Sequence, residues 1–148
     1  MKCFKCDKGK LTSKRADVSG EVRGEKFTVH AEAMVCGKCG FQVLSDDQSD
    51  AYTVAISDAY RREHGLLTST DLKAIRKRFG MSQQSFAKYL KVSVPSVKRW
   101  ESGLIQDEAM DHLIRLQTDP NAARENVEQL EGLLGLTPLM AGPQQIIW

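Results

Sequence analysis

Four cysteines near the start of the chain form the pattern in this sequence that is best suited to chemistry. They come as two pairs, Cys3 with Cys6 and Cys36 with Cys39, and two residues separate the members of each pair. This gap lets both sulfurs of a pair face one point. Two such pairs supply four thiolates in a tetrahedral arrangement, which suits Zn2+ at Zn–S distances of about 2.3 Å. The sequence therefore predicts a structural zinc site with these four ligands.

Two other roles for paired cysteines stay open, a redox dithiol and a pair of disulfides. A thioredoxin-type dithiol needs a βαβ context, which the sequence around these cysteines lacks. The N-terminus has no apolar segment typical of a signal peptide, so we expect a cytoplasmic protein in which reducing conditions disfavour disulfides. A catalytic zinc is disfavoured because four thiolates leave no open coordination position.

A second feature is a basic block between Thr70 and Gly103. The 148-residue chain has a net charge of only +2, but this block holds eight Lys and Arg against two Asp and Glu. Residues 104–148 hold two against seven. A basic block beside an acidic segment is typical of a local nucleic-acid footprint, although charge alone fits a solvated basic surface equally well.

The block is predicted to form three short helices that pool their apolar faces into one core. The expected N-caps are Thr70, Ser82 and Ser93, and Gly80 is expected to end the first helix. The residues expected to face inward are Leu72, Ile75, Phe79, Phe86, Ala87, Leu90, Val97 and Trp100. In a helix-turn-helix the second of the paired helices enters the DNA major groove through its N-terminal half.

Candidate DNA contacts follow from the outward face of the third helix. Arg99 is the expected base reader, because a guanidinium can donate two hydrogen bonds to guanine O6 and N7. Ser96 and Lys98 suit phosphates or neighbouring base edges. Gln83, at the start of the second helix, suits a phosphate oxygen.

The elements that position the cysteines are predicted to be strands followed by one helix. Residues 7–35 read as inserted strands, because apolar and polar residues alternate from Phe27 to Glu32, and turns are expected at Ser19-Gly20 and Arg23-Gly24. Within this alternation His30 is expected to face solvent and not to bind the metal.

The connecting helix is expected to begin after Ser45 and to stop at Gly65. Arg61 and Arg62 in its last turn are expected to complement the helix dipole. Residues 66–69 are expected to form a short hinge to the basic block.

The segment from Ile75 to Gly103 closely resembles the Cro/repressor-type helix-turn-helix family. The shared features are Ser82-Gln83, Phe86-Ala87, Val92-Ser93 and Arg99-Trp100-Glu101-Ser102-Gly103. Lys91 stands where the family usually has Gly, so we expect a left-handed residue strained by about 1 kcal/mol. Pro95 stands where many members place a polar base-reading side chain.

The order of the parts resembles the MqsA (YgiT-type) antitoxins over residues 1–118. The resemblance implies zinc on the four cysteines, a homodimer formed through the C-terminal domain, and repression of the chain's own operon at double-stranded operator DNA. It also implies a cognate toxin, often an mRNA interferase, covered by the N-terminal domain, and Arg99 as chief base reader. Two alternatives stay open, a stand-alone transcription regulator without a toxin and a zinc-containing protein–protein adaptor.

The expected fold is mainly α, with a small β zinc-ribbon-like module at the N-terminus and a C-terminal helical, lambda repressor-like helix-turn-helix domain. We expect a zinc-binding domain with its connecting helix in residues 1–65, the helix-turn-helix domain in 66–118, and a C-terminal helix with an apolar tail in 119–148. A further helix around Ile114 is a candidate dimer interface.

The tail is apolar and uncharged. Its candidate partner-binding residues are Leu136, Leu139, Met140, Ile146, Ile147 and Trp148. So much apolar surface is expected to be covered, either by the chain's own domain or dimer mate, or by another protein. The tail resembles the apolar C-terminal extensions by which a SecB-like chaperone recognises some antitoxins.

Enzymes and membrane proteins are disfavoured. The sequence contains no Ser-His-Asp set, paired catalytic carboxylates, Walker loop or His-rich metal site, and no catalytic residues are expected. No apolar run approaches the roughly 20 residues that span a bilayer. Apolar residues make up 41% and charged residues 27%, an ordinary globular balance.

Overall fold

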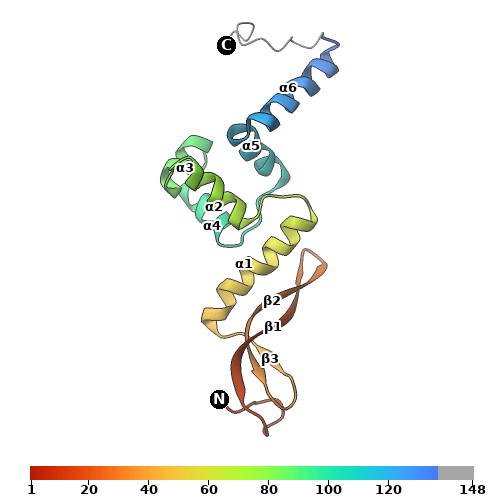
Figure 1. Cartoon of the computed structure of the whole chain (residues 1–148), viewed down its shortest axis with the longest axis vertical. Helices are drawn as coiled ribbons and strands as arrows, with labels where there is room; N and C mark the ends of the chain where they lie inside the picture. Colours follow the sequence, from red (N-terminus) through yellow and green to blue (C-terminus); the bar gives the residue numbers. More distant parts are fainter. Residues whose placement is uncertain (137–148) are drawn as a thin grey trace. The chain divides into compact units, whose positions relative to one another are not determined.

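The computed structural model of the chain describes residues 1–136 (Figure 1). The strands are β1 (Leu11–Val22), β2 (Glu25–Cys36) and β3 (Gln42–Val43), and the helices are α1 (Asp46–Glu63), α2 (Ser69–Arg78), α3 (Gln83–Leu90), α4 (Val94–Glu101), α5 (Glu108–Thr118) and α6 (Pro120–Leu134). The described residues fall into two compact units that divide between Asp107 and Glu108. A small antiparallel sheet at the N-terminus followed by six helices in the described residues confirms the broad expectation of a mainly α protein with a β module.

The sheet is dominated by one long hairpin. Strands β1 and β2 pair along their whole length, with Leu11 opposite Cys36, and β3 adds two residues to the outer edge of β2. The expected turn at Arg23-Gly24 is confirmed, and both residues have positive φ. The expected turn at Ser19-Gly20 is wrong, because both residues lie inside β1. Glycine is needed at position 20 because the Tyr52 side chain lies so close that a Cβ on Gly20 would collide with it.

Helix α1 lies beside this hairpin and forms a core with it (Figure 1). Ser45 caps the helix as expected, in a capping box with Gln48. Buried Ile56 packs with Val29 and Ala31 of β2. The alternation predicted for β2 is thus confirmed, with exposed His30 between these two inward residues.

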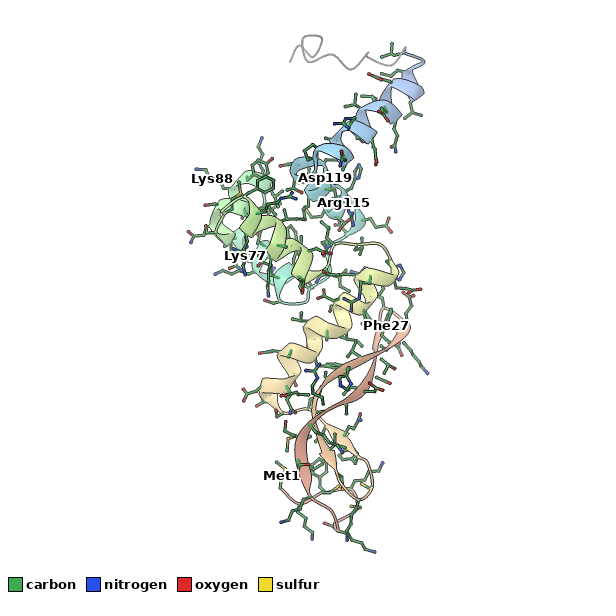
Figure 2. All side chains as sticks on the ribbon, in the orientation of Figure 1. Met1, Phe27, Lys77, Lys88, Arg115 and Asp119 are labelled. Atoms are coloured by element: carbon green, nitrogen blue, oxygen red, sulfur yellow. The ribbon has the colours of Figure 1, made fainter. Side chains whose placement is uncertain are left out.

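The tip of the hairpin contacts the second half of α1. Phe27, labelled in Figure 2, meets Tyr60 edge-to-face with ring centroids 6.0 Å apart. At the end of α1 the His64 ring stacks on Tyr60 and its Nε2 lies 2.5 Å from a Glu25 carboxylate oxygen. Gly65 then adopts positive φ, as expected for a helix stop.

Helix α2 begins two residues earlier than expected. The cap is Thr68 and not Thr70: the Thr68 side chain accepts a hydrogen bond from the Asp71 backbone N–H, and the Asp71 carboxylate accepts one from the Thr68 N–H. The residue three positions after Thr70 is Lys73, which has no acceptor and cannot complete this reciprocal box. The expected caps Ser82 of α3 and Ser93 of α4 are confirmed.

Helices α2, α3 and α4 pool their apolar faces as expected. The residues buried between them include Leu72, Phe86, Ala87, Leu90, Val97 and Trp100. Phe79 was predicted wrongly: it is the C-cap residue of α2 and is 48% exposed, with the Arg78 guanidinium over its ring. Lys91 is left-handed as expected, with φ 60° and ψ 41°.

The second unit contains α5 and α6. Asp119 caps α6, Gly135 ends it in a left-handed conformation, and Arg115 of α5 pairs with Asp111 one turn earlier (Figure 2). Leu136 is exposed. The other predicted tail contacts lie outside the described residues: Leu139, Met140, Ile146, Ile147 and Trp148. None of the helices in residues 1–136 has the length and apolar character needed to cross a membrane.

Candidate metal centre and nucleic-acid interface

The four cysteine sulfurs meet at one point. All four Sγ atoms lie within 4.8 Å of one another, and the Cys3–Cys39 and Cys6–Cys36 pairs are each 3.8 Å apart. A tetrahedron with Zn–S bonds of about 2.3 Å has edges of about 3.8 Å. The cluster can therefore hold a metal ion, and its geometry and ligand chemistry are consistent with zinc.

The β1–β2 hairpin brings the two cysteine pairs together, although 29 residues separate them along the chain. Cys36 is the last residue of β2 and lies opposite Leu11, the first residue of β1, so that the strand ladder returns the chain to the N-terminal pair. Backbone hydrogen bonds then shape each turn, from Asp7 N to Cys3 O and from Gly40 N to Cys36 O. The hairpin and these two turns therefore position the four cysteines.

Backbone N–H groups favour the thiolate form at one ligand. Those of Cys39 and Lys38 point at the Cys36 sulfur and lower the pKa of this thiol to about 6. The N–H of Phe41 lowers the pKa of Cys39, but desolvation and the neighbouring sulfurs outweigh it and raise the pKa to about 11. Four sulfurs this close resist simultaneous ionisation, and a divalent cation would remove that conflict.

Gly9 is part of this site although the sequence analysis did not identify it. A Cβ at Gly9 would collide with the Cys36 sulfur and lie 3.1 Å from the Lys38 Cβ. The backbone at Gly9 also accepts a hydrogen bond from the Cys3 N–H. Its position three residues after Cys6 was the available signal, since a glycine next to a metal-binding turn often marks a close approach.

The residues expected to contact DNA lie on α3 and α4. Lys98 and Arg99 are exposed on α4, and Gln83 is half-buried at the first position of α3. Ser96 is half-buried and bonds to the Ser93 hydroxyl, 2.7 Å away, so its side chain is engaged within the helix cap. As DNA contacts these residues stay a prediction.

The basic block has two further cations on α2 and α3. Figure 2 shows Lys77 on α2 and Lys88 on α3, and both are exposed. Arg76, by contrast, is bound within the fold: its guanidinium donates to both carboxylate oxygens of Glu101 and to the Met81 carbonyl.

Sequence reasoning missed a buried polar network at the end of α1. Arg61 lies in the last turn of α1, where a cation was expected to complement the helix dipole, but it is 0% exposed and also bonds to groups beyond this helix. It pairs with Asp58, which is 6% exposed, and both bond to groups outside α1. Most of those partners are backbone atoms, which leave no signature in the sequence.

The comparisons with known proteins give one family. Residues 1–124 match the family model described as the antitoxin component of a bacterial toxin-antitoxin system, MqsA. The matched segment includes the cysteine cluster and helices α1 to α5. No curated protein matches the chain.

Proposed function

The chain belongs to the MqsA antitoxin family, and from this premise we propose that it represses its own operon as a DNA-bound homodimer and neutralises a cognate toxin. The family is one of antitoxins and not of enzymes. The observation that carries the proposal is the match over residues 1–124, which includes a complete four-cysteine cluster and an exposed basic face on α4.

DNA recognition is assigned to a lambda repressor-like helix-turn-helix domain in residues 66–118. In this proposal α4 lies in the major groove, Arg99 reads a guanine through two hydrogen bonds, and Lys98 and Ser96 bind phosphates or adjacent base edges. Gln83 binds a phosphate oxygen at the start of α3. The exposure of Arg99 and Lys98 supports this assignment.

The metal is proposed to be Zn2+ with a structural role in the domain of residues 1–65. Cys3, Cys6, Cys36 and Cys39 would hold it, since their sulfurs already have tetrahedral spacing. When bound, the ion cross-links the two ends of the hairpin. Four thiolate ligands leave no open position for substrate, so the site does not perform catalysis.

Toxin neutralisation is assigned to the same N-terminal domain, and the toxin class is proposed to be an mRNA interferase. The support for both is family membership. The experiment first asks whether a small basic reading frame adjoins the gene of this chain, and then co-expresses its product with the chain. Rescue of growth supports neutralisation, whereas operator binding without rescue would indicate a stand-alone regulator.

Operator binding is tested by a mobility shift on the DNA upstream of the reading frame, with the wild-type chain and the Arg99→Ala variant. Retardation of this duplex by the wild-type chain, lost or weakened in the variant, supports the repressor. No retardation in either case would leave a zinc-containing protein–protein adaptor as the better description.

The C-terminal tail is proposed to bind a SecB-like chaperone through Leu136, Leu139, Met140, Ile146, Ile147 and Trp148. The support is its apolar, uncharged sequence. Truncation after Gly135 should leave the fold unchanged, improve solubility in the absence of the chaperone and abolish chaperone binding. Loss of stability or of dimerisation in the purified truncated protein would instead indicate that the tail packs on its own domain or dimer mate.

A further inference from the structure

Two buried charges on one turn of α1 reach into the helices that follow. Asp58 and Arg61 are 6% and 0% exposed, and their side chains form an ion pair with an N–O distance of 2.9 Å. Burying two charges is costly unless the remaining polar atoms are also satisfied. Both residues meet this requirement with partners from α2, α4 and the segment after α4.

Arg61 binds the C-terminal end of α4. Its guanidinium donates to the carbonyls of Trp100 and Leu104, each at 2.8 Å, and to the Gln106 side-chain oxygen at 3.1 Å. Trp100 lies in the last turn of α4, where carbonyls have no partner inside the helix. A cation at this end also complements the helix dipole. Arg61 therefore acts as a cap for α4, supplied by another element.

Asp58 binds the N-terminal end of α2. Its carboxylate accepts hydrogen bonds from the backbone N–H of Ser69 at 2.8 Å and from the Ser69 hydroxyl. Ser69 is the first residue of α2, where a negative charge is favourable. The Gln106 amide completes the connection by donating to the Leu67 carbonyl. One turn of α1 thus holds one end of α2 and the opposite end of α4.

The rest of α1 belongs to the sheet that carries the cysteines. Ile56 packs on Val29 and Ala31, and the Gln48 amide donates to the Ser13 hydroxyl on β1 at 2.9 Å. Most of the stability of a helix in a protein comes from the packing of its apolar face, so α1 depends on the sheet for its stability. Loss of the metal, and with it the sheet, would remove the support on which Arg61 is positioned.

We propose that Arg61 is a positioning residue for operator recognition, through which zinc binding at the cysteines and DNA binding at Arg99 are coupled. The inference rests on the proposed repressor function. Because such coupling is reciprocal, zinc raises operator affinity and the operator raises zinc affinity by the same factor. The carrier of the coupling is the short connection from the sheet through α1 to the C-terminal end of α4.

The test is a double-mutant cycle on the full chain. Operator affinity is measured on a duplex covering the DNA upstream of the reading frame, with and without a strong zinc chelator, for the wild type and Arg61→Met. Chelation of the wild type and the Arg61→Met substitution should each lower operator affinity about tenfold or more. Chelation of the Arg61→Met variant should lower its operator affinity no further. Arg62→Met is the matched control: Arg62 is the exposed neighbour, so this variant should keep the zinc dependence of the wild type.

A second measurement does not depend on DNA. Hydrogen exchange of the Leu104 amide, which bonds to the Arg99 carbonyl, should accelerate after chelation or Arg61→Met, whereas that of Phe86 on α3 should not. If the wild type binds no upstream duplex, the repressor proposal is wrong, and the exchange at Leu104 alone decides whether zinc stabilises the end of α4.

Two results would overturn the inference. One is that the fold-losses in operator affinity caused by chelation and by Arg61→Met multiply when the two are combined, which would mean that they act independently. The other is wild-type affinity and wild-type Leu104 exchange in Arg61→Met. If this variant does not fold, Arg61→Lys replaces it in the same cycle. Lysine keeps the charge but lacks the planar guanidinium that reaches two carbonyls. We therefore expect a smaller loss of operator affinity, which again does not add to the loss caused by chelation.

Discussion

Arg76 of α2 and Glu101 of α4 form a two-point ion pair, with N–O distances of 3.1 and 2.9 Å and a Glu101 side chain that is 3% exposed. The pair joins the first helix of the basic block to the helix proposed to read DNA. It also removes Arg76 from the cations that are free to meet phosphates. The first residue of the basic run 76–78 is therefore part of the scaffold and not of the binding surface.

Glu101→Ala should lower the free energy of unfolding by about 3–5 kcal/mol, because it leaves the mostly buried Arg76 charge without its partner. Urea unfolding followed by circular dichroism measures the change. Glu63→Ala, at an exposed position at the end of α1, is the control and should change stability by less than about 0.5 kcal/mol. Equal stability of the two variants would contradict a structural role for the pair.

Cys36→Ser should lose the metal and unfold residues 1–44, while α3 and α4 stay folded. Structural zinc contributes folding free energy of order 10 kcal/mol in small modules, and this position supplies one of its four thiolates. Metal analysis and amide NMR spectra measure the two outcomes. A wild-type chain that carries far less than one zinc, with its sheet still folded, would contradict the structural role of the metal.

Gly9→Ala should weaken metal binding although it removes no ligand, because the new methyl group would collide with the Cys36 sulfur. Gly37→Ala is a matched control in the second cysteine turn, where a Cβ would meet nothing within 4 Å. Competition with a colorimetric zinc chelator compares the two affinities. If both variants bind zinc as the wild type does, the sulfur positions are more adaptable than the structure indicates.

Arg99→Ala should lower operator affinity by about 1–3 kcal/mol and relax base preference at one position in each half-site. Gln83→Ala should weaken binding to all sequences more evenly, since a phosphate contact carries no base information. Binding to a set of single-base operator variants separates these effects, and the half-sites should be centred about 34 Å apart. Unchanged affinity and base preference in Arg99→Ala would assign recognition to another face.

Local signals explain what the sequence could predict. The cysteine spacing indicated the metal cluster, and the serines before α3 and α4 indicated the caps, because each feature involves neighbours along the chain. The buried faces of α3 and α4 were likewise visible as a helical period. The left-handed conformation of Lys91 was predicted from the resemblance to Cro/repressor-type helix-turn-helix proteins, which usually have glycine in that turn.

Features that depend on distant partners could not be predicted in the same way. Arg61 looks like an ordinary cation in a last helical turn, and its carbonyl partners lie about 40 residues further on. Gly20 looks like a turn residue, and only the position of Tyr52 shows that the absence of a side chain is what matters. In both cases the important contact joins residues that are far apart in the sequence, so no local pattern predicts it.

The alignment of the two hairpin strands decides whether the four cysteine sulfurs can meet at one point. Cys36 reaches the N-terminal pair only while it lies opposite Leu11 in the β1–β2 ladder. A slip of one residue would turn every side chain of a strand to the opposite face and carry the Cys36 sulfur away from the other three. Only correctly aligned hairpins would then present four thiolates together. A bound metal ion would therefore stabilise the correctly aligned hairpin selectively, because a misaligned hairpin cannot bring the four sulfurs together.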